Sequence, residues 1–274
     1  METKASLLEQ LHEVEKWEKD QGGLWIWDRA ARLPFKLLDK LTPSFIQRKI
    51  GTLLDELGYY IQSGGRYLTK QSSVLKKVER YAETPVHSID DVKNLPLAAM
   101  DQTALSIQKT HSGAATLQGA TTGVGGVFTL AADIPAILAI SLKTVQEIAV
   151  AYGYDPNERE ERIFIIKCLQ FVSSDIVGKR AILNEISDYA NRGNGKEMMS
   201  QMQGWREVVL AYREQYSLKK IFRLVPVVGI LFGAISNRSM IEDLSDTAIM
   251  LYRKRRILDK LASHEAKMES ESRS

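Results

Sequence analysis

Residues 113–142 read GAATLQGATTGVGGVFTLAADIPAILAISL, and this stretch decides the fold class. Its first twenty residues contain five glycines, five alanines and four threonines, and Asp133 is the one charged group among all thirty. Small residues recur every four positions at Ala115, Gly119 and Gly123, a spacing that lets two helix backbones approach closely. The stretch therefore predicts a helical hairpin in which a Gly/Ala-rich helix is buried against its neighbours.

A second apolar block, residues 221–237, has the same character. Four of its residues follow spacings of 3, 4 and 4, so they share one helix face: Pro226, Gly229, Gly233 and Asn237. The face continues at heptad-like spacing through Ile241, Leu244, Ala248, Leu251 and Leu258. We expect one long helix from about 226 to 260. Its smooth first half should pack on the stripe that includes Gly119 and Gly123.

The length of the first block would permit a membrane span, but its composition argues against one. Few of its first twenty residues are large and apolar, and a charge near its middle costs about 2.5–3.5 kcal/mol on insertion scales. The uncharged part of the second block, residues 224–236, is too short to cross a bilayer. A buried hairpin is the favoured interpretation, with shallow membrane contact as the next and a span as the last.

The rest of the chain carries helix punctuation and no clear strand alternation. Thr42-Pro43 and Asp155-Pro156 supply an N-cap followed by proline at the start of predicted helices, and Gly64-Gly65 supplies a stop. We therefore predict an all-α fold, a multi-helix single domain. It divides into a basic and aromatic helical part (1–90), a helical core (91–262) and a polar tail without regular structure (263–274).

Composition limits the class of protein. The 274 residues are 44% apolar and 26% charged with a net charge of +3, which excludes global disorder and gives no indication of nucleic-acid binding. Cys168 lies in an apolar run and is interpreted as a small buried hydrophobe. A single cysteine favours a reducing compartment, and the N-terminus lacks a signal-peptide pattern. A cytoplasmic protein, peripheral at the inner face of the membrane, is expected.

The standard catalytic motifs G-x-S-x-G, G-x-x-x-x-G-K-[ST] and C-x-x-C are missing from the sequence. The four histidines are scattered, so their spacing suggests neither a metal site nor a cofactor. Three polar-cleft candidates flank the apolar hairpin, namely Asp101, His111 and Asp133. The structural interpretation makes Asp133 an N-cap and His111 a helix-end residue. The functional interpretation places a carboxylate base beside His111 in an apolar cleft.

Two basic clusters are candidates for contact with lipid. Leu24-Trp25-Ile26-Trp27 precedes Arg29, Arg32 and Lys36, a combination of aromatic and cationic groups typical of interfacial segments. The second is the run Arg253, Lys254, Arg255 and Arg256. A solvated basic face explains the first cluster without a partner, and a helix C-terminus that favours cations explains the second. Attraction to anionic lipid is the alternative for both.

Two blocks of sequence resemble the EcsC family. The first reads GATTG…ADIPAIL…QEIA…YGYDP over residues 119–156, and the second VPVVGILFGAISN…DTA…LYRKRR over 225–256. The resemblance extends over roughly residues 10 to 260 and is weakest in the first 90. It implies a bacterial helical protein whose type member is encoded beside an ABC transporter. It brings no established enzymatic activity, so it assigns no catalytic residue.

Three functions remain open at this point. The first is a non-enzymatic interaction protein at the cytoplasmic membrane surface that binds anionic lipid or a membrane protein such as an ABC transporter. The second is a soluble binding module for an apolar or acyl ligand. The third is a hydrolase that uses Asp101, His111 or Asp133. The sequence sets no oligomeric state.

Overall fold

The computed structural model describes residues 2–21, 57–64, 69–123, 130–173, 179–184, 186 and 226–272. Within these ranges the regular structure is helical and no strand is present, which confirms the predicted all-α class. None of the helices in these ranges combines the length and the apolar character that crossing a membrane requires.

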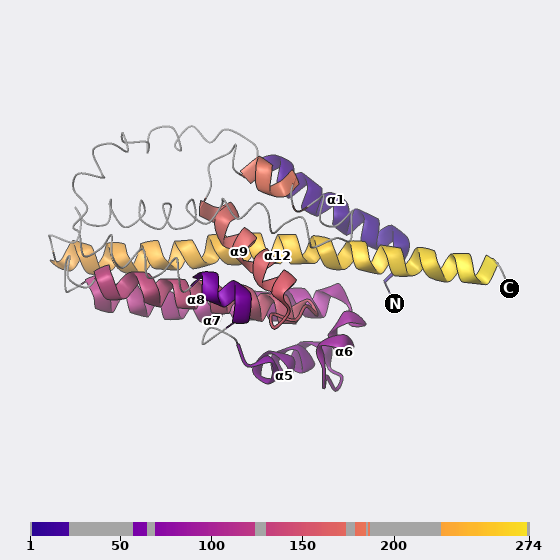
Figure 1. Ribbon diagram of the computed structural model, residues 1–274, viewed down its shortest axis with the longest axis horizontal. Helices are drawn as coiled ribbons and strands as arrows, with labels where there is room; N and C mark the ends of the chain where they lie inside the picture. Colours follow the sequence, from indigo (N-terminus) through magenta and orange to yellow (C-terminus); the bar gives the residue numbers. More distant parts are fainter. Residues whose placement is uncertain are drawn as a thin grey trace.

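Three long helices form the centre of the molecule. They are α7 (Leu97–Gly123), α8 (Leu130–Ala151) and α12 (Pro226–Ser272), which run side by side along the long axis (Figure 1). The most extensive packing between any two described helices joins α7 to α12. Gln108 binds Asp246 at 2.6 Å and Gln118 binds Asn237 at 2.8 Å, so the two helices are antiparallel. The helices α7 and α8 form the predicted hairpin.

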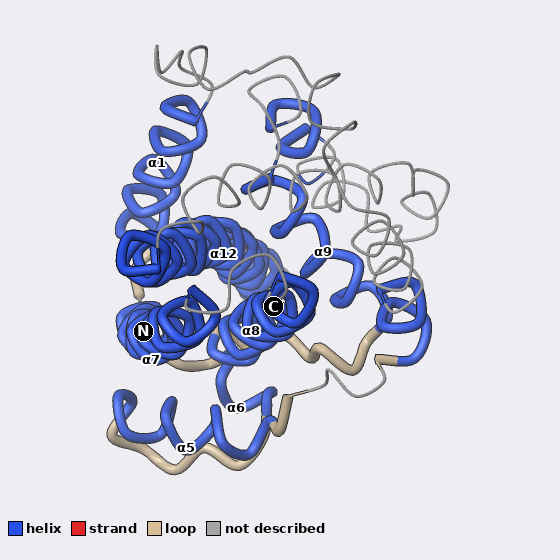
Figure 2. Tube along the Cα trace, turned by 90° about the vertical axis from the view of Figure 1, so that its left-hand side faces the viewer, coloured by secondary structure: helices blue, strands red, loops and turns tan. Residues whose placement is uncertain are grey.

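Shorter helices surround this centre. The end-on view in Figure 2 places α5 (Gln71–Ala82) and α6 (Ile89–Lys93) on one side and α1 (Lys4–Gln21) on the other. Helix α9 (Arg159–Ser173) lies beside α12 and is buried along residues 161–171. The amphipathic pattern of α1 explains its position, because Leu7 and Val14 are fully buried and Leu11 and Trp17 pack against the core.

The apolar face expected for the last helix also lies in the core. Ile241, Leu244, Ala248 and Leu251 are buried, as the heptad-like spacing predicts. The close packing expected for Pro226, Gly229, Gly233 and Gly123 concerns side-chain positions outside the described residues. The neighbouring positions do lie at the helix contact: Ala115 and Gly119 are buried in α7, and Asn237 is buried in α12.

Two helix boundaries differ from those expected. Helix α8 begins at Leu130, three residues before Asp133, so Asp133 lies inside the helix and is not the expected N-cap. Helix α12 continues to Ser272, through the polar tail for which no regular structure was expected. The tail contains three glutamates together with Ala266, Lys267 and Met268, which all have high helix propensity. Its Glu265 also forms an ion pair with Lys4 of α1 at 3.1 Å.

Candidate functional site

The basic run of α12 forms the centre of a network of internal polar contacts. Four consecutive helical residues project at steps of about 100°, so Arg253, Lys254, Arg255 and Arg256 point in four different directions. Each contacts a different set of residues. Arg253 contacts α1 and α7, Lys254 contacts α1, Arg255 contacts α9, and Arg256 contacts the end of α8. The run therefore attaches α12 to four other helices.

Arg255 makes two of these contacts, both with the buried carboxylate of Glu161. Arg255 makes a bidentate ion pair with Glu161, with both N–O distances at 3.0 Å, and Glu161 also accepts a hydrogen bond from Tyr252. The Arg255 guanidinium lies 4.0 Å from the ring centre of Tyr154 and 4.1 Å from that of Phe164. Bidentate pairing together with aromatic stacking is geometry that arginine provides and lysine does not. Arg255 therefore serves as a packed structural residue of the core.

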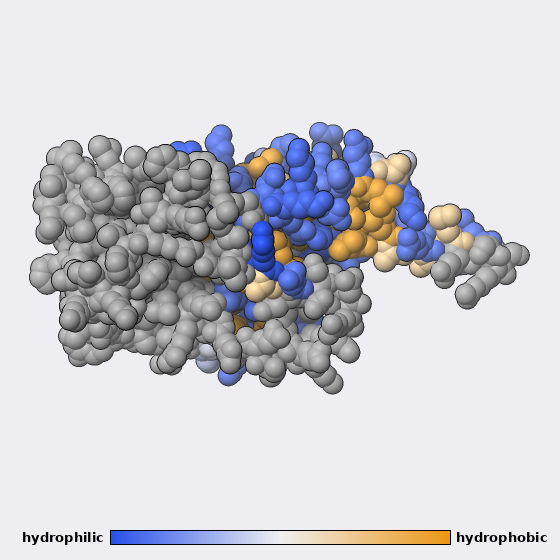
Figure 3. Space-filling model, turned by 90° about the horizontal axis from the view of Figure 1, so that it is seen from above, coloured by the Kyte–Doolittle hydropathy of each residue, from blue (hydrophilic) through white to orange (hydrophobic). Residues whose placement is uncertain are grey.

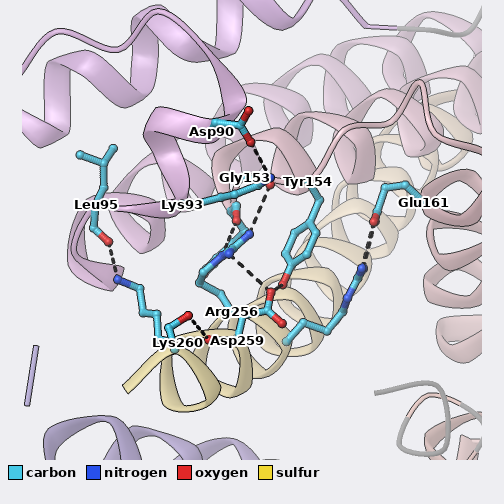
Figure 4. A network of polar contacts seen from close by, with 12 residues as sticks. Asp90, Lys93, Leu95, Gly153, Tyr154, Glu161, Arg256, Asp259 and Lys260 are labelled. Carbon is cyan, nitrogen blue, oxygen red and sulfur yellow. Dashed lines mark hydrogen bonds and ion pairs between the residues drawn. The ribbon is translucent and has the colours of Figure 1, made fainter. Parts of the chain in front are cut away.

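Arg256 closes the end of α8. Its Nε donates to the carbonyl of Tyr152 at 2.8 Å, and its Nη2 donates to that of Gly153 at 3.2 Å (Figure 4). Carbonyls at a helix C-terminus lack intrahelical donors, so this guanidinium supplies the missing partners. Lys260, one turn further along α12, donates to the Leu95 carbonyl at 2.7 Å.

The basic run was expected to lie at a helix C-terminus, where the helix dipole favours cations. The structure does not place it there. Arg256 lies sixteen residues before α12 ends at Ser272, which is about four turns. The macrodipole acts within the last turn of a helix, so it does not account for these cations. Arg253, Lys254 and Arg255 pair with carboxylates of other helices instead, and Arg256 pairs with Asp259 of α12. Contact of this run with lipid stays a prediction.

The first polar-cleft candidate, Asp101, belongs to this network. The hydroxyl of Tyr152 donates to Asp101 Oδ1 at 2.5 Å, and Arg253 Nε lies 3.3 Å from Oδ2. Burial raises the pKa of Asp101, while the Tyr152 hydrogen bond and the Arg253 charge lower it. The net direction is upward from the ordinary value of 3.8.

The second candidate, His111, lies in a separate cluster between α5, α7 and α8. It is inside α7 and not at a helix end as expected, because α7 continues to Gly123. Its Nε2 is 3.2 Å from Glu147 Oε2, within ion-pair distance but outside the angular range of a hydrogen bond. Lys77 of α5 donates to the same oxygen at 3.2 Å. Burial raises the pKa of Glu147, but His111 and then Lys77 together lower it by more. The net direction of its pKa is therefore below the ordinary 4.5. Glu147 is the acceptor that joins the three helices.

The structure therefore does not bring the three polar-cleft candidates together. Asp101 and His111 are ten residues apart in α7, about 15 Å along its axis, and each contacts different partners. Asp133 lies in α8 fourteen residues before Glu147, about 21 Å along that axis, and its side chain is outside the described residues. The carboxylate–histidine contact that does form uses Glu147.

Several residues of these networks were not singled out from the sequence. Glu161 and Tyr152 are the main examples, and Lys77 is a third. Glu161 is one of two acidic residues in the first turn of α9, where the helix dipole alone would explain it. Tyr152 lies in the Tyr-Gly-Tyr-Asp-Pro part of the EcsC-like block, which was the one available signal. Among the described residues no cluster of metal-ligating side chains is present.

Known proteins are similar to this chain over most of its length. The model of the EcsC protein family matches residues 8–257. The chain belongs to the EcsC family. It is 55% identical over 269 residues to the "Uncharacterized protein YdbA" of Bacillus subtilis (strain 168), covering 98% of this chain and 99% of that protein.

A second relative is more distant. The protein named "Protein EcsC" of the same Bacillus subtilis strain is 28% identical over 158 residues, which cover 58% of this chain and 64% of that protein. No solved structure matches the chain at a significant level. The family membership expected from the quoted blocks is thus confirmed. The sites discussed above rest on the geometry of this chain alone.

Proposed function

We propose that this EcsC-family protein is an interaction protein that binds the inner surface of the cell membrane through residues 24–40. The observation that carries the proposal is the sequence of this segment, in which two of the four tryptophans of the chain, Trp25 and Trp27, immediately precede Arg29, Arg32 and Lys36. Tryptophan favours the headgroup region of a bilayer, and cations are attracted to anionic lipid. The segment itself lies outside the residues that the structure describes.

The polar networks support this choice over the other candidate cations. Arg253, Lys254, Arg255 and Arg256 already have internal carboxylate or carbonyl partners, so their charges are balanced within the molecule. Asp101 and His111, which a hydrolase would need side by side, contact different groups. Both facts favour the N-terminal basic cluster, Arg29, Arg32 and Lys36, as the lipid-binding group.

Sedimentation with vesicles tests the proposal. The full-length protein should bind vesicles that contain anionic lipid at low salt and bind less at high salt, because salt screens the attraction. The variant Arg29→Gln/Arg32→Gln/Lys36→Gln should bind on the order of a hundredfold more weakly, since three cations contribute about 1 kcal/mol each. The variant Trp25→Ala/Trp27→Ala should bind more weakly at both salt concentrations.

A matched control removes three exposed cations elsewhere. Lys76→Gln/Arg80→Gln/Lys109→Gln changes the net charge equally and should retain most of the binding. Absence of vesicle binding at both salt concentrations, together with purely soluble behaviour in fractionated cells, would refute the proposal. Binding to native membranes but not to lipid vesicles would assign the contact to a membrane protein, such as the ABC transporter that the family resemblance suggests.

A further inference from the structure

Acidic groups of the N-terminal segment meet cations of α12 where helix α1 lies on it. Residues 1–20 carry six acidic and three basic side chains, in a chain whose net charge is +3. Glu13 lies 3.2 Å from Arg253, Glu18 lies 2.7 Å from Lys254, and Glu2 lies 2.9 Å from Lys260. Glu2, just before α1, pairs with Lys260, whereas Glu13 and Glu18 further along the chain pair with Arg253 and Lys254 earlier in α12. Helix α1 is therefore antiparallel to the C-terminal half of α12 (Figure 1).

The surface of α12 beneath α1 is both cationic and apolar. The side chains of Arg253, Lys254 and Lys260 are only 16–17% exposed while α1 is in place. Leu7 and Val14 of α1 are fully buried between these ion pairs. Seen from the side on which α1 lies, the outer surface of the described residues is largely hydrophilic with hydrophobic patches between (Figure 3). Removal of α1 would therefore expose an apolar strip flanked by cations.

We infer that α1 is an acidic cover over a second surface for anionic lipid, formed by Arg253, Lys254 and Lys260 of α12. Carboxylates and lipid phosphates are alternative partners for the same cations, and an apolar strip beside cations is the composition of an interfacial surface. The inference rests on the proposed function, because α1 ends at Gln21, three residues before the segment proposed to reach the membrane. A membrane bound to that segment would lie close to the covered surface.

The pairs that hold the cover are suited to exchange. Glu13 is 61% exposed, so solvent and salt reach its contact with Arg253, whereas Glu18 is 16% exposed. A high local concentration of anionic headgroups would compete with these carboxylates for the same cations.

Vesicle binding by full-length variants tests the inference. Glu2→Gln/Glu13→Gln/Glu18→Gln weakens the cover. Its control, Glu9→Gln/Glu15→Gln/Asp20→Asn, makes the same change in net charge at α1 residues that form no ion pair with α12 among the described contacts. With vesicles of phosphatidylglycerol and phosphatidylcholine, the first variant should bind about tenfold more tightly than the wild type, and the control less than about threefold more tightly. Adding Lys254→Gln and Lys260→Gln to the first variant should remove the gain.

The outcomes separate this inference from the proposed function. Equal gains for both triple variants would mean that net charge alone matters, which overturns the cover. Formation of a dimer by the first variant, detected by light scattering, would assign the surface to α1 of a second copy and also overturns it. If the wild type binds vesicles but the first variant binds no better, the cover is wrong and the proposed function stands. If only the first variant binds, the cover is right and the proposed function fails.

A second measurement needs no substitution. Amide hydrogen exchange of the wild-type protein should become faster in residues 4–21 when anionic vesicles are added and should not change with neutral vesicles. Unchanged or slower exchange of α1 on anionic vesicles would contradict the displacement of the cover, even if the triple variants fail to fold.

Discussion

At the scale of single residues, Gly153 shows how local conformation and tertiary contact require the same residue. Its φ of +80° lies in the left-handed region that glycine adopts readily. Tyr154 N–H donates to the Ala149 carbonyl and Gly153 N–H donates to that of Val150, which together form a Schellman motif at the end of α8. A Cβ at this position would lie 3.0 Å from Lys93 Cγ and 3.1 Å from Arg256 Nη2.

We expect Gly153→Ala to destabilise the protein by about 1–3 kcal/mol, because the backbone conformation is unfavourable for alanine and Arg256 must shift. Urea unfolding followed by circular dichroism measures this change. Gly113→Ala is the control of opposite sign. Gly113 lies inside α7 with no atom within 4 Å of an added Cβ, so alanine there should stabilise by about 0.5–1 kcal/mol. Equal effects at the two positions would contradict the interpretation.

At the scale of elements, Glu147 joins α5, α7 and α8 through Lys77 and His111. Its pKa is lower in the folded state than the ordinary 4.5, so the folded protein binds fewer protons than the unfolded chain near this pH. The stability from the ionised carboxylate is complete above the unfolded pKa and is lost as the pH falls through the folded value.

The pH dependence of Glu147→Gln should reveal this contribution. At pH 7 the variant should be less stable than the wild type by about 1–3 kcal/mol, because Lys77 loses a buried charged acceptor. The difference should shrink as the pH falls below about 4.5, where the wild-type carboxylate takes up its proton. Urea unfolding at pH 7 and at acid pH measures both values. Glu79→Gln, at an exposed position of α5, is the control, and a pH-independent difference for Glu147→Gln would refute the assignment.

The packing of α7 on α12 provides a second test at this scale. The predicted close approach of small residues concerns Gly119 and Gly229, one on each helix. Replacing either with leucine should destabilise the protein by about 1–3 kcal/mol, because an added side chain overpacks a close helix contact. Thermal unfolding measures the loss, and Gly113→Leu, at an exposed position of α7, should cost much less. If Gly119→Leu and Gly229→Leu both keep wild-type stability, the two glycines do not mark the contact.

At the scale of the whole molecule, the helices differ in how deeply they are integrated. Helix α9 is buried along residues 161–171 and α7, α8 and α12 form the centre, whereas α1 contributes only Leu7 and Val14 as fully buried residues. Leu11 and Trp17 are partly buried against the core, and the ion pairs with α12 contribute about 0–1 kcal/mol each where they are exposed. Local opening free energies vary across a protein, and α1 has the weakest support among these helices.

Salt should therefore loosen α1 selectively. Raising the ionic strength to about 1 M shortens the Debye length to about 3 Å and screens the ion pairs that hold it. We expect faster amide hydrogen exchange in α1 at high salt and little change in α8 and α9. Sodium sulfate at matched ionic strength is a useful comparison, because it screens charge while it strengthens apolar contacts. Salt-independent exchange of α1 would show that apolar burial holds it.

The origin of each correct and incorrect expectation can be followed in particular residues. Helical periodicity predicted the buried faces of α1 and α12, since Leu7 and Val14 or Ile241 and Leu244 recur at intervals that local geometry places on one side. Helical periodicity does not predict whether Asp101 and His111 share a cleft. Proximity in sequence near the hairpin suggested a common cleft, but the ten-residue separation in a straight helix keeps the two groups apart.

The sequence by itself determined the all-α class, the helical hairpin, the amphipathic faces and membership of the EcsC family. The fold class, the hairpin and the faces follow from spacing and residue type along one chain, because helix geometry acts there. The family follows from the resemblance of the two quoted blocks. Only the tertiary structure decided the partners of Arg253, Lys254, Arg255 and Arg256. Their acceptors outside α12 belong to α1, α7, α9 and the end of α8, and they lie between 94 residues (Glu161) and 240 residues (Glu13) away along the chain. Ion pairing depends on which helices become neighbours, and this is set by the packing of the whole core.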